Sequence, residues 1–213
     1  MTTAMARSDF AFESLKRTPT TVYLVLPTDR LEAYSRWLRL LVTLSLRDMA
    51  RSLEKPASPV LFLLDEFAAL GRLASIERAM GLMAGYGVQL WPIVQDVSQL
   101  RDLYNKRIGT FFANAEVLQV FGVNDHEGAK LFSDMLGQQT VVFQTMSRAL
   151  DSDLSGLTYA EHHHGRPLLT PDEVRVLPMS RELLFLAGRR PIVADKLAHY
   201  QDREFSGMYD RID

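Results

Sequence analysis

The chain has 213 residues, of which 47% are hydrophobic and 23% charged, a balance typical of a folded globular domain with a sizeable core. It contains no cysteine, which excludes disulfides and thiolate metal sites. The formal net charge of -2 gives no overall basic surface, so any contact with nucleic acid has to be local.

The sequence gives no sign of a membrane span or of export. A span needs about 18 or more uninterrupted apolar residues, and arginines and Asp48 interrupt the longest candidate, residues 31–53. The first ten residues, MTTAMARSDF, lack the hydrophobic segment of a secretory signal. We therefore expect this chain to be cytoplasmic.

The first predicted elements are a strand over residues 21–26 and a long helix after Asp29. The strand is β-branched and nearly continuously apolar, as in strands buried on both faces. Apolar residues then recur at steps of three and four from Leu31 to Ser45, which predicts an amphipathic helix that Asp29 can cap.

Two further strand and helix pairs follow. Residues 60–64 predict a fully apolar strand, and the pattern from Phe67 to about Gly85 is helical. Residues 88–94 predict a third strand, in which Pro92 is awkward for a central position. A helix through Leu100, Leu103 and Tyr104 comes next.

Strand and helix continue to alternate as far as residue 136. Residues 117–121 predict a fourth strand, and Asn124 and Asp125 can cap a helix that Gly137 closes. This alternation predicts an α/β fold with a mainly parallel sheet and helices on both faces.

In the last third of the chain the predicted strands and helices no longer alternate regularly. We expect an edge strand to about Met146, then a long exposed loop over the polar residues 147–165. Thr170 begins a capping-box pattern that predicts a short helix. Residues 182–187 and 191–194 predict a closing hairpin.

Two adjacent carboxylates, Asp65 and Glu66, directly follow the apolar strand 60–64. The carboxyl end of a strand is where α/β sheets bind ligands, and the pattern is that of a Walker B motif. In that interpretation Asp65 holds Mg²⁺, usually through water, and Glu66 polarises the water that attacks the γ-phosphate. The alternative is an acidic helix N-terminus stabilised by the helix dipole.

Gln95 ends the next strand in the sequence. If the two strands are neighbours, Gln95 lies beside Glu66, where an amide can sense the γ-phosphate or orient water. The alternative is an ordinary cap for the helix that follows.

Several separated motifs give the chain a resemblance to a known family. These are RTPTTVYLVLPTDRLE, PVLFLLDEFAALGRL, GYGVQLWPIVQDVSQL with Tyr104 and Asn114, GVND, GRPLLTPDEV and PIVADKLAHY. In this order they resemble the TraG- and TraD-like coupling proteins of conjugation and type IV secretion, over residues of about 10 to 210. Several motifs in one order are far more specific than a single motif.

The resemblance implies a RecA-like P-loop ATPase that binds ATP and Mg²⁺. It also implies a ring, taken as a hexamer, at the cytoplasmic face of the bacterial inner membrane, where it passes DNA with a relaxase, or effector cargo, to the secretion channel. Asp65 and Glu66 match the family's Walker B motif, and Gln95 matches its strand-end glutamine. Arg166 is a candidate arginine finger or phosphate sensor for a neighbouring subunit; the alternative is a salt bridge that fixes the loop before Thr170.

One part of the expected ATP site is missing from these 213 residues. No G-x-x-x-x-G-K-[ST] motif occurs, and no lysine follows the glycines between Gly81 and Gly87. Without that Walker A loop there are no backbone amides and no lysine to hold the phosphates. We expect a partial motor domain, a truncated product or one part of a split motor, that binds no nucleotide tightly and is inactive alone. The alternative is an inactive remnant that serves as an interaction module or has no activity.

Three other features have simpler explanations. His162, His163 and His164 are consecutive and point in different directions, so we expect a solvated loop rather than a metal site. The basic residues Lys106, Arg107, Arg148, Arg189 and Arg190 form no continuous run, and we expect scattered surface charge. The aromatic residues are expected in the core rather than on a base-stacking surface; these are Trp37, Trp91, Phe111, Phe112 and Phe121.

Overall fold

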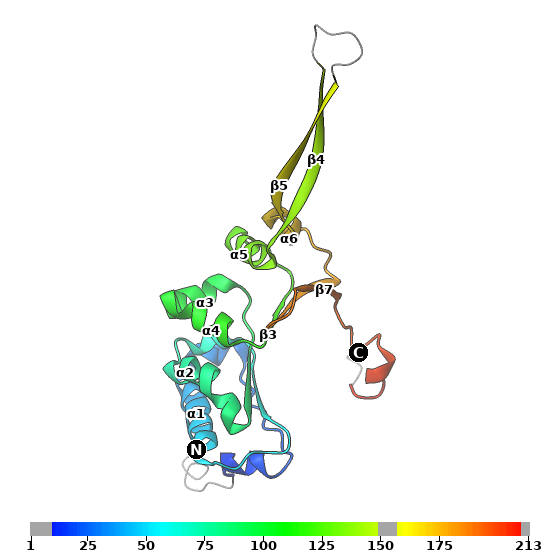
Figure 1. The fold of residues 1–213 in the computed structure, drawn as a ribbon. Coiled ribbons are helices and arrows are strands. Elements are labelled where there is room, and N and C mark those ends of the chain that lie inside the picture. The colour runs from blue at the N-terminus through cyan, green and yellow to red at the C-terminus, as the bar shows by residue number, and fades with distance from the viewer. Residues whose placement is uncertain (1–9, 149–156, 210–213) are drawn as a thin grey trace. The chain divides into compact units, whose positions relative to one another are not determined.

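The computed structural model describes residues 10–148 and 157–209, which belong to two compact units, Met1–Glu116 (unit 1) and Val117–Asp213 (unit 2). Figure 1 shows the elements of each unit in chain order. No helix among the described residues is long and apolar enough to span a bilayer.

Unit 1 combines one parallel strand pair with short and long helices. Its elements are η1 (Phe12–Lys16), η2 (Thr28–Arg30), α1 (Leu31–Arg51), β1 (Val60–Leu64), η3 (Phe67–Leu70), α2 (Ala74–Leu82), η4 (Met83–Tyr86), β2 (Val88–Pro92), α3 (Val97–Tyr104), η5 (Asn105–Arg107) and α4 (Ile108–Asn114). The predicted strands 60–64 and 88–94 are confirmed, as is the long helix after residue 30. Arg30 rather than Asp29 is the N-cap of that helix, because Asp29 lies in the turn of η2.

β1 and β2 are parallel and in register from Val60 opposite Val88 to Leu64 opposite Pro92. The ladder continues past both strands, since the Ile93 amide donates to the Leu64 carbonyl and the Phe67 amide donates to the Ile93 carbonyl, both at 3.0 Å. Ile93 therefore points its backbone groups toward β1, and the neighbouring Pro92 points away from it. The missing N–H of Pro92 consequently costs no bond in this ladder.

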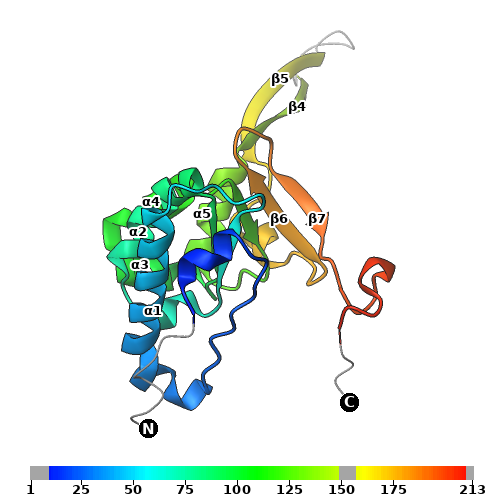
Figure 2. The same cartoon turned by 90° about the horizontal axis from the view of Figure 1, so that it is seen from below.

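The core of unit 1 lies between one face of this strand pair and the helices. Met49 of α1, Phe67 of η3, Ile76 of α2 and Val88 of β2 are fully or almost fully buried there. Figures 1 and 2 show α1 and α2 side by side, and the two helices are in contact. The apolar residues at helical spacing thus bury one stripe of each helix, as amphipathic helices do.

The opposite face of the strand pair is bare within the described residues. Leu61 and Leu63 of β1 are 50% and 54% exposed, and Trp91 of β2 is 48% exposed. Side chains alternate along a strand, so these three share one face. The expectation that Trp91 lies in the core is therefore wrong, and so is that for Trp37 on the outer side of α1, whereas Phe111 is buried as expected.

The predicted strand 21–26 is absent. Residues 18–27 are irregular and carry exposed apolar side chains such as Tyr23 and Val25. A β-branched, apolar sequence favours extended backbone, but a strand also needs a hydrogen-bonding neighbour. No such neighbour is found in the described part of the chain.

The predicted continuous helix 67–85 is also broken. It consists of η3, α2 and η4, with a break at Gly71. Gly71 has φ 66° and ψ -169°, a conformation that residues with a Cβ rarely adopt. The turn separates the residues after β1 from α2, so the segment carrying Asp65 and Glu66 is not part of a long helix.

The described residues of unit 2 form two antiparallel sheets, two α-helices and one short 3-10 helix. Its elements are β3 (Val117–Val120), α5 (His126–Leu136), β4 (Gln138–Arg148), β5 (Leu157–Pro167), α6 (Pro171–Arg175), β6 (Arg181–Leu186), β7 (Ile192–Asp195) and η6 (Arg203–Phe205). The strand order is β3-β6-β7 in one sheet and β4-β5 in the other. Figure 2 shows β6 and β7 as one ribbon pair.

Within the described residues, parallel pairing is found only between β1 and β2, whereas a mainly parallel sheet was expected. β3 was predicted to continue that sheet, but it pairs antiparallel with β6, from Val117 opposite Leu186 to Val120 opposite Leu183. The predicted hairpin near residues 182–194 is confirmed as β6 and β7. Phe121, expected in the core, is 54% exposed and lies under the Lys196 ammonium, 4.7 Å from its ring centre.

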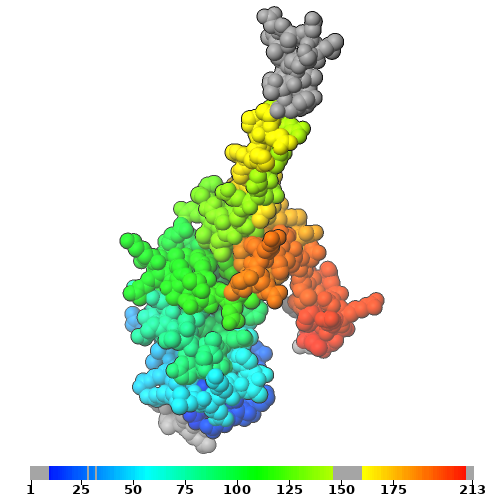
Figure 3. All heavy atoms as spheres, viewed as in Figure 1, coloured from blue at the N-terminus to red at the C-terminus, as the bar shows by residue number. Residues whose placement is uncertain are grey.

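The predicted loop 147–165 is largely a strand. Residues 157–165 belong to β5, which pairs with β4 from Leu157 opposite Arg148 to Pro167 opposite Gln138; residues 149–156 lie outside the described part. Figure 3 shows the described part of this hairpin, yellow-green and yellow, open to view along its length. The prediction failed because the polar sequence of β5 has no strand pattern of its own, and its pairing with β4 is what orders it.

Local capping signals in unit 2 are confirmed. The Asp125 side chain accepts from the Gly128 amide at the start of α5, and Gly137 follows the helix with φ 87°. Thr170 and Glu173 form a complete capping box at the start of α6. These caps fix both helices independently of the sheets.

Candidate functional site

The carboxyl ends of β1 and β2 carry the residues singled out by the sequence. Asp65 and Glu66 follow β1, Gln95 follows β2 after two residues, and all three are exposed. The parallel register brings the two strand ends to one edge of the sheet. Ligands of α/β proteins bind at this edge.

Glu66 and Gln95 are in direct contact. The Gln95 side-chain amide donates a hydrogen bond to Glu66 Oε1 at 2.9 Å. The expectation that the two side chains lie beside each other is confirmed. Asp65 completes the group through its Oδ1, which accepts from the Glu66 backbone amide at 3.0 Å.

Glu66 has an unusual backbone for a residue with a side chain. Its φ and ψ are 48° and 43°, in the left-handed region. Such conformations cost about 1–3 kcal/mol and persist where the surrounding structure imposes them, often at functional sites. Here the Phe67 amide bond to Ile93 fixes the chain directly after Glu66. The turn aims the Glu66 carboxylate toward the end of β2.

The start of α3 holds the Gln95 end of the site. The Asp96 side chain accepts from the Gln99 amide at 2.9 Å and from the Ser98 hydroxyl, and the hydrogen bond from Ser98 lowers the pKa of Asp96 most, followed by that from the Gln99 amide. The Gln99 side-chain oxygen in turn accepts from the backbone amide of Gln95 at 3.4 Å. Sequence reasoning missed this network, although an acid three residues before a glutamine at a helix start is a capping signal.

The arrangement suits a divalent cation and a polarised water. Two adjacent carboxylates offer oxygen ligands, which Mg²⁺ prefers. The Gln95 amide can turn its oxygen or its nitrogen to a water or phosphate oxygen, because an amide both donates and accepts. Asp65 is the described residue that would hold the cation, and its exposure leaves room for the water ligands of the cation.

Arg166 belongs to unit 2 and forms a different contact. It lies in β5 opposite Gln139, and its guanidinium forms an ion pair with Glu173 of α6. This is the kind of contact that the structural alternative predicts, since Glu173 also accepts from the Thr170 amide at 2.8 Å. A role for Arg166 toward a neighbouring subunit stays a prediction.

The histidines lie on β5 and alternate between its faces. His162 stacks on Phe143 of β4 with ring centres 5.5 Å apart, and His163 lies opposite Val142. Among residues 10–148 and 157–209 no group of three or more potential metal ligands is found. The histidines therefore provide exposed aromatic surface on a hairpin in the described structure.

Comparison with solved structures defines the class of fold. The conjugative coupling protein TrwB matches with a TM-score of 0.74 at 22% identity, over 90% of this chain and 44% of that chain. TrwB with the ATP analogue ADPNP matches with a TM-score of 0.71 at 23% identity. The chain therefore shares the fold of the matched part of TrwB, in agreement with the RecA-like fold that the sequence resemblance implies.

Sequence comparison gives the family. Residues 1–211 match the family described as type IV secretory system conjugative DNA transfer, and the chain belongs to it. It is 32% identical to the protein VirD4 of Rhizobium radiobacter over 98% of this chain and 30% of that protein. It is 27% identical to the conjugal transfer protein TraG of Escherichia coli over 95% of this chain and 36% of that protein. The chain thus spans about a third of the length of these curated relatives.

Proposed function

We propose that this chain forms the Walker B part of the ATP site of a coupling-protein motor. In this proposal ATP hydrolysis drives DNA, or DNA with bound protein, toward a type IV secretion channel. The observation that carries the proposal is the contact between Glu66 and Gln95 at the ends of adjacent parallel strands. The family membership supports it.

Each residue has a defined task in this proposal. Asp65 holds Mg²⁺ through water, and Glu66 accepts a proton from the water that attacks the γ-phosphate. Gln95 reports whether the γ-phosphate is present, because its amide lies against Glu66. Support for the nucleotide and metal comes from TrwB, which has structures with ADPNP and with ADP and Mg²⁺.

The phosphates need groups that these 213 residues do not contain. No Walker A sequence is present, so the backbone amides and lysine that cradle the phosphates have to come from another stretch of polypeptide. We therefore propose that this stretch acts as part of a larger motor. By the same resemblance that motor is a hexameric ring at the cytoplasmic face of the inner membrane, with relaxase-bound DNA or effectors as cargo.

A second candidate function is that of an interaction module without catalysis. The bare face formed by Leu61, Leu63 and Trp91 favours it. Parallel sheets are almost always covered on both faces, so this face is suited to pack against further α/β structure. Packing of this face against another polypeptide is compatible with catalysis. The two candidate functions therefore differ in whether the assembled protein hydrolyses ATP.

The test is nucleotide binding by the chain alone and with a polypeptide that supplies the Walker A segment of a relative. We expect weak or no binding of ATP·Mg²⁺ by the chain alone in calorimetry, and binding with turnover in the mixture. The Glu66→Gln variant is the control, since it keeps binding and loses turnover. Low-micromolar binding and turnover by the chain alone would contradict the proposal. Assembly without ATP binding would favour the interaction module.

A further inference from the structure

Helix α3 is attached at both ends to the segment that follows β1. At its N-terminal end the Gln95 amide bonds to Glu66 Oε1 at 2.9 Å. At its C-terminal end the Tyr104 hydroxyl accepts a hydrogen bond of 3.0 Å from the backbone amide of Leu73. Both partners lie in one short segment, residues 66–73. The helix and the segment therefore form a closed circuit.

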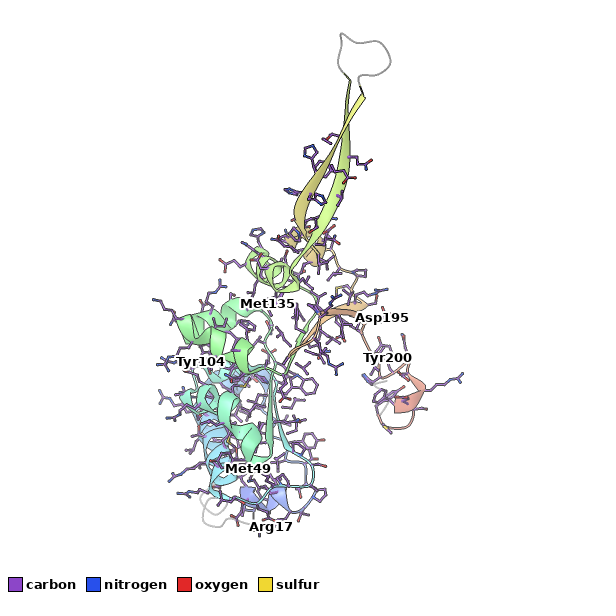
Figure 4. The ribbon with its side chains drawn as sticks, in the orientation of Figure 1. Arg17, Met49, Tyr104, Met135, Asp195 and Tyr200 are labelled. Carbon is purple, nitrogen blue, oxygen red and sulfur yellow. The ribbon has the colours of Figure 1, made fainter. Side chains whose placement is uncertain are left out.

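Tyr104 is built into this position. It is 2% exposed, and its ring lies between Phe67, stacked at 6.1 Å, and Phe111, edge-on at 4.6 Å. Burial raises the pKa of Tyr104, so the hydroxyl stays neutral and can accept from an amide near neutral pH. Leu73 precedes α2 and is itself buried, so its amide would lose a partner that water cannot replace. Figure 4 marks Tyr104 among the helices of unit 1.

Backbone strain occurs beside both attachment points. Glu66 and Asn105 have φ of 48° and 49°, and they are the non-glycine residues with positive φ in the described ranges. Asn105 directly follows Tyr104. Strained backbone of this kind is retained where the fold imposes it and is often found at switch regions. One strained residue, Glu66, therefore belongs to the circuit, and the other, Asn105, directly follows it.

A third contact holds η5, the turn that directly follows α3. The guanidinium of Arg107, the last residue of η5, donates to Glu77 of α2 at 2.7 Å. Glu77 is buried although it is charged, and an unpaired buried carboxylate would be costly. α3 has eight residues and is therefore only about 12 Å long. A short helix held at both ends moves as one body.

We propose that Tyr104 is a positioning residue that sets the geometry of the Glu66 and Gln95 pair through α3. A displacement of Gln95 then moves Tyr104 against Leu73, and release of Leu73 loosens the Glu66 side of the site. The functional role of this circuit rests on the proposed function. If ATP binds at the site, the circuit would transmit the presence or absence of the γ-phosphate from Gln95 to α2 and η5. The mechanical link itself needs no nucleotide.

The link is tested on the chain itself by nuclear magnetic resonance without nucleotide. Tyr104→Phe removes the hydroxyl and keeps the ring. We expect the Leu73 amide to exchange with solvent about tenfold faster, as for loss of about one net hydrogen bond. We also expect the side-chain amide signals of Gln95 to shift, which a local structural role would not cause. Tyr86→Phe is the matched control, because Tyr86 packs partly buried against the same core.

The reverse arm uses Gln95→Ala, an exposed substitution that leaves the core intact. We expect it to change the exchange rate of the Leu73 amide, whereas Asp102→Ala, an exposed substitution on α3 itself, should change it less. The proposal is overturned if the Gln95 signals do not move in Tyr104→Phe, or if Leu73 does not respond to Gln95→Ala. If Tyr104→Phe fails to fold, the Gln95→Ala arm decides alone. If the mixture with the Walker A polypeptide neither binds nor hydrolyses ATP, the proposed function is refuted and the result of this experiment is unaffected.

Discussion

The side chains of Gln95 and Glu66 meet in a hydrogen bond of 2.9 Å although the residues are 29 positions apart. Their backbones are brought together by the parallel pairing of β1 and β2. The contact joins a carboxylate that can accept a proton to a side-chain amide that can form a hydrogen bond with a nearby water or phosphate oxygen. Each residue can be changed without disturbing the core, because both are exposed.

Glu66→Gln should abolish ATP hydrolysis while ATP remains bound, in a longer protein that supplies the Walker A loop. The substitution removes the acceptor for the proton of the attacking water and leaves the metal ligand Asp65 in place. Losses of this kind are about 10² to 10⁴ in rate. Steady-state ATPase assays and nucleotide filter binding measure the two effects, with Glu116→Gln as an exposed control. Turnover near the unmodified rate would refute the role of Glu66.

Gln95→Ala should slow turnover moderately and remove its stimulation by single-stranded DNA in the same longer protein. The side-chain amide of Gln95 is neutral and lies directly before α3. Its loss should therefore affect the coupling between ATP hydrolysis and α3 more than the proton transfer to Glu66. The measurement is ATPase activity with and without DNA. Asp102→Ala, at an exposed position further along α3, is the comparison variant. Full DNA stimulation in Gln95→Ala would show that the assigned role is wrong.

Leu61→Thr combined with Leu63→Thr should lower the binding of a hydrophobic dye and reduce aggregation of the chain. Both side chains are about half exposed on the bare face of β1 and β2, and threonine keeps the strand preference. Surface changes of this kind shift stability by only about 0.5 kcal/mol. Dye fluorescence and light scattering give the readout. Leu53→Thr, exposed outside the sheet, should have little effect. A chain that binds no dye before substitution would contradict the prediction.

Glu173→Gln should remove an acid-sensitive contribution to the stability of α6. The hydrogen bond from the Thr170 backbone amide is the main cause that lowers the pKa of Glu173 below its usual 4.5, and the nearby charge of Arg166 lowers it further. A lowered carboxylate pKa gives stabilisation that is present above the unfolded pKa and lost as the pH falls through the folded pKa. Amide exchange in residues 171–175 should therefore quicken on acidification in the unmodified chain and change less in Glu173→Gln. Equal pH dependence in both would rule out this contribution.

Much of the candidate site could be read from the sequence because its determinants are local. An apolar run that stops at Asp65 and Glu66 marks a strand end, and a second run marks another near Gln95. Helix caps such as Asp125 and Thr170 are likewise set by residues within one turn. For these features a few neighbouring side chains decide the conformation.

The tertiary structure alone decided which extended segments pair. Residues 21–26 have a strand-like composition and no partner in the described structure, whereas the histidine-bearing β5 has a polar composition and pairs with β4. It also decided that β3 pairs antiparallel with β6 and that Tyr104 reaches Leu73, 31 positions away. The physical reason is that a strand's hydrogen bonds, and a buried hydroxyl's partner, come from residues distant in sequence, while hydrophobic pattern and capping act over a single turn or strand.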